Sequence, residues 1–448
     1  MAKKENRTDS LNRRDFMQTT AAASLAFLGT GAFHVRAAGS DRIRVGLIGC
    51  GGRGTDAAKD CAAASEAVEI YAMGDLFRDK VEESYQNLKD GNTNTLGGEN
   101  ARPMKKHFNV SKDRCFAGFD AYQKVLDSGV DMVILAASPQ FRPLHIKAAV
   151  EAGKNIFTEK PVAVDPAGVR SVIASSELAA QKGHAIVAGT QRRHQNAYLE
   201  IMKRVHDGQI GKIVSAEAYW IGGCPWWDAG PDLWKKKQEK GWTEAEYQYR
   251  NWFHFTWLSG DIIVEQHIHN LDVVNWAVGK TPVKALGMGG RAVRFGEGRG
   301  DIWDHFSVVY EYPDGIHLTS MCRQHDKCTD QVSERIVGTK GTAYFWGSDS
   351  RIEGENPYQF EGEAKNPYVQ EHIDLIESIR NGKPLNDGRQ VAESTLTAVL
   401  GRMSAYTGRA INYDWALKAS KLDLTPEKYE FGDLPVPQVA VPGVTELV

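Results

Sequence analysis

The sequence predicts an α/β protein in which an N-terminal parallel sheet is followed by a second α/β domain with antiparallel strands. Three observations predict this fold class. Apolar runs typical of buried strands alternate with helical stretches between residues 43 and 189, which is the order found in parallel sheets. Residues 305–310 and 316–321 alternate apolar and polar side chains around Pro313-Asp314-Gly315, which predicts a hairpin. The 448 residues are enough for two or three domains.

Five strands and two helices are expected in the first half of the chain. The strands are residues 43–48, 68–73, 131–136, 155–158 and 184–189, and the helices are residues 144–152 and 169–181. Because ligands bind beyond the carboxyl ends of parallel strands, the residues that follow these strands should line one crevice. These residues are Asp75, Pro139, Glu159, Lys160 and Gln191.

A glycine-rich turn follows the first of these strands and predicts a dinucleotide site. Its glycines Gly49, Gly51 and Gly54 have the GxGxxG spacing, with Gly52 and Arg53 between the last two. They permit a tight turn, close approach of the backbone to a pyrophosphate, and close packing of helix on strand. Asp75 lies about 20 residues further on, where an acid binds the adenosine ribose and repels a 2′-phosphate. We therefore expect a Rossmann domain that binds NAD rather than NADP, although Arg78 nearby would also accommodate NADP.

The first forty residues resemble an export signal. Arg13 and Arg14 precede the mildly apolar run 19–33, and Val35-Arg36-Ala37 offers a cleavage site. A twin-arginine signal of this kind carries folded proteins out of the cytoplasm, so a periplasmic or extracytoplasmic location is expected. A disordered basic tail is the alternative. The six cysteines are scattered and lack the spacing of a disulfide framework, which agrees with export in folded form.

Composition excludes two classes of partner. The formal net charge of -3 argues against an electrostatic nucleic-acid binder. No apolar run reaches the ~20 residues that a membrane-spanning helix needs.

Two later motifs resemble a known family. Residues 131–161, which end in Glu159-Lys160-Pro161, look like the central stretch of the Gfo/Idh/MocA superfamily. Residues 259–272 resemble its second signature, a Gly-rich turn followed by an acid, then by His four residues later, then by Asp. The resemblance implies an N-terminal Rossmann domain and a C-terminal α/β domain. The large, mostly antiparallel sheet of the second domain carries the substrate and often forms the subunit interface.

The same resemblance implies three catalytic residues: Lys160, His269 at the catalytic histidine position, and Glu265 where the family usually has Asp. Oxidation of a secondary alcohol needs a base for the hydroxyl proton while a hydride leaves for the nicotinamide. Charge on the nicotinamide would disfavour the ammonium form of a buried lysine, and a histidine beside a carboxylate relays protons near neutral pH. If residues 265–269 are helical, Glu265 and His269 share one face. The alternatives are a surface lysine and a buried, hydrogen-bonded histidine.

The remaining site residues follow from their places in the chain. Besides the glycine turn and Asp75, cofactor contacts are expected from Ser138, Pro139, His145, Glu159, Lys160 and Gln191. Substrate contacts are expected from Arg192, His194, Trp252 and His267, although a structural ion pair is an equal alternative for the residues at 192–194. Residues 219–258 hold seven of the 11 tryptophans, whose rings stack on sugars or fill an oligomer interface. No metal site is expected, because Glu265, His267 and His269 are poorly spaced for one helix face.

These observations divide the chain and predict its activity. We expect a signal or linker in residues 1–40, the Rossmann domain in 41–190, a substrate and oligomerisation domain in 191–423 and a C-terminal arm in 424–448. In the second domain, residues 213–220 are expected as an antiparallel strand and residues 372–379 as a helix. The leading hypothesis is an NAD-dependent sugar or cyclitol oxidoreductase that forms a homodimer or homotetramer. The alternatives are a redox glycosidase or lyase that recycles its NAD, and a non-catalytic dinucleotide-binding protein.

Overall fold

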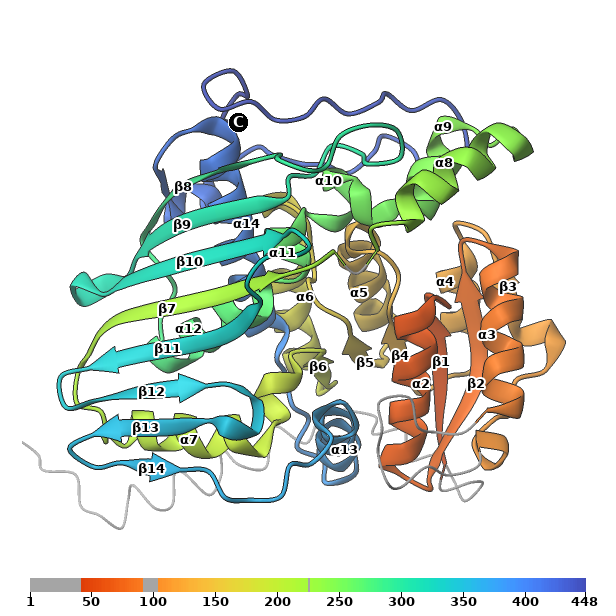
Figure 1. Cartoon of the computed structure of the whole chain (residues 1–448). Helices are drawn as coiled ribbons and strands as arrows, with labels where there is room; N and C mark the ends of the chain where they lie inside the picture. The colour runs from red at the N-terminus through yellow and green to blue at the C-terminus, as the bar shows by residue number, and fades with distance from the viewer. Residues whose placement is uncertain (1–41, 92–103, 225) are drawn as a thin grey trace, which may run out of the picture. The chain divides into compact units, whose positions relative to one another are not determined.

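The computed structural model describes residues 42–91, 104–224 and 226–448. The export signal expected in residues 1–40 lies outside these residues. Within them the chain forms a six-stranded and a nine-stranded sheet, with helices packed around and between them (Figure 1). The predicted fold class is therefore confirmed.

The first sheet is parallel throughout and has the strand order β3-β2-β1-β4-β5-β6. Its strands are β1 (Ile43–Ile48), β2 (Val68–Asp75), β3 (Cys115–Ala117), β4 (Met132–Leu135), β5 (Asn155–Thr158) and β6 (Ile186–Ala188). All five predicted strands are present, and only the three-residue β3 was not predicted. The order reverses between β1 and β4, and ligands of such sheets bind at this point.

Five helices connect these strands. They are α2 (Gly52–Ala64), α3 (Arg78–Asp90), α4 (Ala121–Asp127), α5 (Arg142–Glu151) and α6 (Pro166–Lys182). The bounds of α6 follow from local sequence: the Asp165 side chain accepts a hydrogen bond from the Gly168 N–H at 2.6 Å, and Pro166 fits the first turn. Gly183 ends the helix because its φ of 71° is readily adopted only by glycine.

The second sheet has the order β14-β13-β12-β11-β7-β10-β9-β8-β15. Its strands are β7 (Ile213–Gly222), β8 (Lys284–Gly290), β9 (His305–Glu311), β10 (His317–Gln324), β11 (Gln331–Gly338), β12 (Gly341–Phe345), β13 (Arg351–Gly354), β14 (Tyr358–Gln359) and β15 (Ile411–Asn412). The predicted hairpin is β9 and β10. Strand β7 corrects one expectation, because it pairs antiparallel with β11 but parallel with β10.

The helices of the second half are α7 (Asn196–His206), α8 (Ala229–Lys240), α9 (Glu244–Arg250), α10 (Thr256–Ser259), α11 (Ile262–Glu265), α12 (Ile268–Val278), α13 (Pro367–Arg380), α14 (Gly388–Thr407) and α15 (Tyr413–Lys418). Short 3₁₀ turns cover 104–106, 112–114, 139–141, 191–194, 252–254, 313–315 and 347–349.

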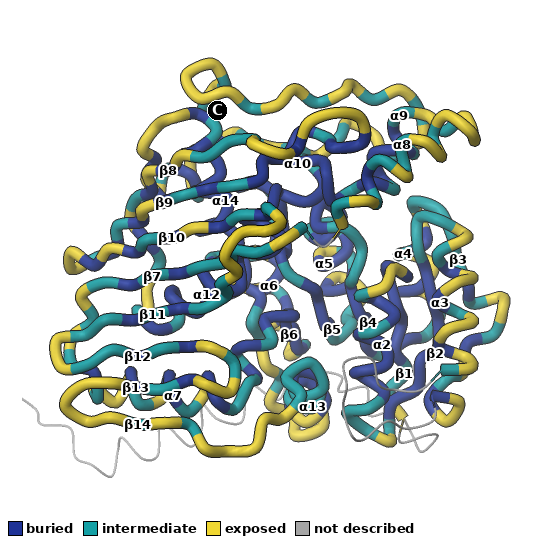
Figure 2. The backbone as a smooth tube through the Cα atoms, in the orientation of Figure 1, coloured by how far each residue is buried: buried dark blue, intermediate teal, exposed yellow. Residues whose placement is uncertain are grey.

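Two of these helices join the halves of the molecule. Helix α14 packs between α6 and β8, so one hydrophobic core runs from the first sheet's helices to the second sheet. Helix α13 is longer than the predicted 372–379 and packs against α2, where Leu375 and Ile376 complete the core on the other face of the first sheet. Figure 2 shows the strands of this sheet buried along their length, whereas the outer turns of the second sheet are exposed.

The last residues of the chain lie extended over the chain's own surface. The Leu424 N–H donates to Asp165 at 2.7 Å, and the Gly443 N–H donates to the Thr407 carbonyl at 3.1 Å. Among the described residues, no helix is both long and apolar enough to cross a membrane.

Candidate active site

The glycine turn has the geometry that a dinucleotide requires. Gly49 has a φ of 99°, and a Cβ there would lie 2.3 Å from the Ala137 nitrogen. A Cβ on Gly54 would lie 1.9 Å from the Gly49 carbonyl oxygen, so close packing of the helix on the strand excludes any side chain. By contrast, a Cβ on Gly51 or Gly52 would meet nothing within 4 Å. The backbone at these two glycines therefore borders open space at the amino end of α2, which suits a pyrophosphate.

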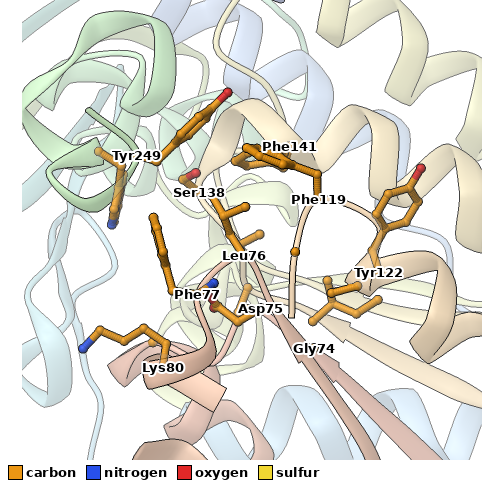
Figure 3. Close-up of a pocket in the computed structure, with 18 of the residues that line it drawn as sticks. Gly74, Asp75, Leu76, Phe77, Lys80, Phe119, Tyr122, Ser138, Phe141 and Tyr249 are labelled. Carbon is orange, nitrogen blue, oxygen red and sulfur yellow. The ribbon is translucent and has the colours of Figure 1, made fainter. Parts of the chain in front are cut away.

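A pocket of about 970 Å³, counting its open mouth, adjoins this turn. Its lining includes Gly49, Gly51, Asp75, Ser138 and His145, all of which the sequence predicted as cofactor contacts. Aromatic rings dominate the remaining wall. Figure 3 labels Phe77, Phe119, Tyr122, Phe141 and Tyr249, and Trp252 also belongs to the lining. A pocket with a polar floor and flat apolar walls fits the adenosine half of a dinucleotide.

Asp75 lies at the end of β2 on the floor of this pocket. Its carboxylate accepts hydrogen bonds from the Cys50 N–H at 2.7 Å and from the Phe77 N–H at 2.8 Å. Burial raises its pKa, and these two backbone donors oppose the rise. Each carboxylate oxygen has a second acceptor position, so Asp75 can hold the glycine turn and still accept ribose hydroxyls.

The predicted catalytic residues meet where β5 ends against the second domain. The Lys160 ammonium donates to Glu265 Oε1 at 3.1 Å and to the Glu265 backbone carbonyl. Lys160 follows β5, whereas Glu265 is the last residue of α11, so the ion pair joins the two halves of the chain. Glu265 is buried and Lys160 is largely buried, with 9% and 13% of their side-chain surfaces exposed.

His269 lies beside this pair in the first turn of α12. Its ring stacks on Trp220 of β7, with 5.7 Å between the ring centroids. Burial, followed by the charges of Lys160 and Arg192, lowers the pKa of His269 well below its usual value, so the imidazole is neutral at physiological pH. The predicted single helix face is not observed, because α11 ends at Glu265 and α12 begins at Ile268. Glu265 pairs with the lysine, and no described side chain hydrogen-bonds the His269 ring.

Glu159 connects the glycine turn to Lys160. Its carboxylate accepts from Arg53 Nε at 2.6 Å and from the Lys160 N–H at 3.3 Å. Burial alone would raise the pKa of Glu159, but the charges of Arg53, Lys160 and Arg142 hold it below its usual value. The carboxylate fits because residue 189 is glycine: a Cβ there would lie 2.7 Å from Glu159 Oε2.

The side chain of Arg53 is occupied within the protein. Besides Glu159, its guanidinium reaches Asp60 at 3.0 Å and Glu371 of α13 at 3.4 Å. A cofactor contact from Arg53 is therefore left to its backbone. Gln191, another predicted cofactor residue, donates to the Tyr368 hydroxyl at 3.3 Å. Pro139 is buried in the 3₁₀ turn before α5.

Three of the predicted substrate residues also have partners inside the protein. Arg192 pairs with Glu334 of β11 in the interior. His194 Nδ1 lies 2.5 Å from Asp374 Oδ2 of α13. His267 is fully buried, and its Nε2 lies 2.7 Å from the Ser320 hydroxyl on β10. No local sequence pattern predicts these contacts, because each partner is distant in sequence, and the substrate roles of the three residues stay predictions.

The fourth predicted substrate residue, Trp252, lines the adenosine pocket. Its ring centroid lies 6.5 Å from that of Trp226. Sequence reasoning missed several other lining residues of this pocket, namely Lys80, Phe119, Leu233, Tyr249 and Arg250. The density of aromatic residues in 219–258 was the one available signal, and it was interpreted as a sugar platform or an oligomer interface.

One group of metal-ligating side chains occurs in the described ranges, at Asp304, His305 and His325. Asp304 Oδ1 is 2.8 Å from His305 Nδ1 and 3.0 Å from His325 Nε2. Asp304 Oδ2 accepts the backbone N–H groups of Ala292, Val293 and Arg294. With both oxygens occupied, this aspartate anchors the loop between β8 and β9.

We predict that Gly189→Ala disturbs the site through Glu159. The new Cβ would overlap the buried carboxylate, and overpacking of this kind costs about 1–3 kcal/mol. The free energy of unfolding and the affinity for NAD should both fall, as measured by chemical denaturation and by Trp fluorescence titration. Gly432→Ala is the matched control, because a Cβ there meets nothing within 4 Å. Equal behaviour of the two variants would contradict this role of residue 189.

We predict that Asp75→Ala changes the choice between NAD and NADP. The substitution removes the charge that repels a 2′-phosphate and leaves Lys80 and Arg250 in the same pocket. The ratio of NADP affinity to NAD affinity should rise at least about tenfold, which corresponds to ~1.4 kcal/mol. The ratio is the informative quantity, because loss of the bonds to Cys50 and Phe77 will weaken both cofactors. Glu82→Gln, exposed on α3 and outside the pocket lining, should leave the ratio unchanged, and an unchanged ratio in Asp75→Ala would refute the assignment.

Comparison with known proteins agrees with this geometry. Residues 43–190 match the model of an oxidoreductase family with an NAD-binding Rossmann fold, and residues 198–344 match the GFO/IDH/MocA C-terminal domain. The scyllo-inositol 2-dehydrogenase (NAD(+)) of Bacillus subtilis is 24% identical over 227 residues, which are 50% of this chain and 58% of that protein. The myo-inositol 2-dehydrogenase of Thermotoga maritima is 22% identical over 358 residues, which are 76% of this chain and 90% of that protein.

The match thus spans little more than half of the Bacillus subtilis protein and most of the Thermotoga maritima protein. Among solved structures, the aldose-aldose oxidoreductase of Caulobacter crescentus complexed with glycerol has a TM-score of 0.62 at 17% identity, covering 83% of this chain and 99% of that one. At this identity the likeness concerns the fold. The predicted NAD-binding Rossmann domain is confirmed, and the chain belongs to the Gfo/Idh/MocA family.

Proposed function

We propose that this protein is an NAD-dependent oxidoreductase that moves a hydride between the nicotinamide and a secondary hydroxyl of a sugar, sugar derivative or cyclitol. The observation that carries the proposal is the junction of Lys160, Glu265 and a neutral His269 at the end of β5, beside the cofactor domain. The inositol dehydrogenases among its relatives support the same class of substrate.

Lys160, Glu265 and His269 would have different roles toward a substrate hydroxyl. When bound, NAD supplies the hydride acceptor. Lys160 has three N–H donors, and two of them go to Glu265, so the third is free for the substrate oxygen. A fixed cation there stabilises the negative charge that develops on this oxygen as the hydride leaves. His269 is neutral and can accept the hydroxyl proton.

An aromatic side chain next to these groups suits a carbohydrate. Trp220 stacks directly on the His269 ring, with 5.7 Å between the ring centroids. Flat rings of this kind pack against the C–H faces of sugars and cyclitols. A protein that only binds dinucleotides would have no use for a buried Lys160–Glu265 pair beside such rings.

We also propose that the protein is a homo-oligomer, a dimer or a tetramer, that associates through its large sheet. On β8, β9 and β10, exposed apolar side chains share the face opposite α12 and α14: Leu286, Met288, Val309 and Met321. Met288 is 71% exposed. A contiguous apolar face on a sheet marks an interaction surface, and a second copy of the same sheet would cover it symmetrically.

We predict that Lys160→Met damages turnover far more than cofactor binding. Methionine retains an unbranched apolar side chain and removes the charge, and positioned acid–base groups contribute about 10²–10⁴-fold to rate. His269→Asn should lose a similar factor. Glu265→Gln should lose less, because it retains an acceptor for Lys160 through Oε1 and the backbone carbonyl. Turnover is measured on the best substrate from a panel of sugars and cyclitols, and NAD affinity by Trp fluorescence.

Lys147→Met is the matched control, since this exposed lysine pairs with Glu151 on the surface of α5. It should retain full activity. Full turnover in Lys160→Met would refute the catalytic role of this lysine.

We further propose that the protein is exported in folded form through its N-terminal sequence. Replacing both Arg13 and Arg14 by Lys should retain the protein in the cytoplasm, because the twin-arginine pathway reads this pair. Cell fractionation with an antibody to the protein measures the distribution. Replacing Lys3 and Lys4 by Arg is the matched control, because it preserves charge and leaves the pair intact. An unchanged distribution in the Arg13/Arg14 variant would exclude this export route.

A further inference from the structure

Three metal-ligating side chains converge at one end of the second sheet. Asp304 ends the loop between β8 and β9, His305 begins β9, and His325 follows β10. Strands β9 and β10 are paired and lie side by side (Figure 1). Each of the three residues offers one ligand atom, and these atoms all lie within 4.8 Å of one another. Two imidazoles and one carboxylate are ligand types that zinc prefers in proteins.

The backbone of the β8–β9 loop fixes the carboxylate of Asp304. Its Oδ2 accepts from the N–H groups of Val293 and Arg294 at 2.7 and 3.0 Å. The Ala292 N–H lies 2.8 Å from Oδ2 and 3.0 Å from Oδ1. Burial would raise the pKa of Asp304, but hydrogen bonds from His325, from the loop backbone and from His305 hold it well below its usual value. Oδ1 is therefore a fixed, negatively charged atom that faces two imidazoles.

Both imidazoles direct a ring nitrogen at this oxygen. His305 Nδ1 lies 2.8 Å and His325 Nε2 lies 3.0 Å from Asp304 Oδ1. Each neutral imidazole carries one proton, and this proton can reside on the other ring nitrogen, which leaves the facing nitrogen free to bind a cation. Phe306 and Val308 are buried under the sheet, so His305 lies on its outer face, where 40% of the side chain is exposed. Water can therefore reach the cluster from this face.

The spacing of the cluster needs little adjustment to hold zinc. Zinc binds imidazole nitrogen and carboxylate oxygen at about 2.0–2.2 Å, so tetrahedral ligand atoms lie roughly 3.4 Å apart. The separations of 2.8 and 3.0 Å from Asp304 Oδ1 reach this value by a small rotation of the partly exposed His305 ring. Three protein ligands leave one position for water. Magnesium and calcium prefer a shell of oxygen atoms, so the two imidazoles select against them.

We propose that Asp304, His305 and His325 bind one zinc ion, with water as the fourth ligand, and that this ion pins the β8–β9 loop to the end of β10. Zinc replaces the two hydrogen bonds between the imidazoles and Oδ1. The bonds from the loop backbone to Oδ2 remain. His325 is distant in sequence from Asp304 and His305, so no short motif marks the site.

The pinned loop also supports a residue next to Glu265. Asp304 accepts from the Arg294 N–H, and the buried Arg294 guanidinium donates to Gln324 at the end of β10. Gln324 Nε2 in turn donates to Gln266 Oε1 at 2.5 Å, and Gln266 directly follows Glu265. A zinc ion at Asp304 would therefore restrain the Arg294–Gln324–Gln266 chain as well as the loop itself.

The test measures zinc binding by the full-length, untagged chain. The protein is treated with EDTA, dialysed, and titrated with Zn²⁺ in competition with a chromophoric chelator. Metal that stays bound through gel filtration is counted by inductively coupled plasma mass spectrometry. We expect close to one zinc ion per chain. His305→Asn and His325→Asn should each weaken binding at least about 100-fold, because even outer-shell partners of metal ligands contribute about 10–100-fold.

His317→Asn is the matched control, because this exposed histidine begins β10 and lies outside the cluster. It should bind zinc as tightly as the unaltered chain. Far-UV circular dichroism checks that each variant is folded, and His305→Asn removes a partly exposed ring that the core does not need.

Hydrogen exchange tests whether the ion pins the loop. Zinc should slow amide exchange in residues 291–304 of the full chain, which include the Val293 and Arg294 N–H groups bonded to Asp304. Exchange in helix α6 should not change. In His305→Asn the same zinc concentration should leave the exchange of residues 291–304 unaltered. Zinc that binds at the cluster without slowing exchange in this loop would refute the pinning.

Three other results would overturn the site itself. A full-length chain that takes up no zinc would leave the three residues as a hydrogen-bonded cluster only. Zinc uptake that both His305→Asn and His325→Asn retain would place the ion elsewhere. Magnesium bound as tightly as zinc would exclude imidazole ligation. None of these measurements uses the proposed oxidoreductase activity, so that either proposal can fail without the other.

Discussion

The buried ion pair between Lys160 and Glu265 is the contact on which the rest of the site depends. Lys160 follows the Rossmann strand β5, and Glu265 is the last residue of α11. The two halves of the chain must therefore keep their relative positions for the two charges to remain paired. Separating such a pair leaves an uncompensated charge in the interior, which typically costs 3–5 kcal/mol. Helix α14 packs against both α6 and β8 and thereby gives the pair a rigid frame. A hydride acceptor bound by one half is consequently held at a fixed position relative to groups of the other.

The charges around this pair lower the pKa values of two neighbouring groups, Glu159 and His269. Arg53, in the glycine turn, forms an ion pair with Glu159, and the Glu159 carboxylate also accepts from the Lys160 backbone N–H. Positive charge from Lys160 and Arg192, added to burial, keeps His269 neutral. The glycine turn thus has two roles, because it approaches the cofactor through its backbone and fixes the Glu-Lys-Pro corner through one side chain.

Local sequence was sufficient to predict the elements that short sequence patterns specify. The strand before Gly49, the acid at Asp75 and the Glu-Lys-Pro corner all have short-range signatures, and the structure has the predicted strands in place. The partners of buried polar side chains were not predictable. The pairing of Arg192 with Glu334 and that of His267 with Ser320 are decided by packing between segments that are distant in sequence. The break between α11 and α12 was also missed. The start of α11 was missed for the same reason: Asp261, with a φ of 72°, accepts from the Ile262 N–H and the Trp303 N–H, and the second of these donors lies on a remote loop.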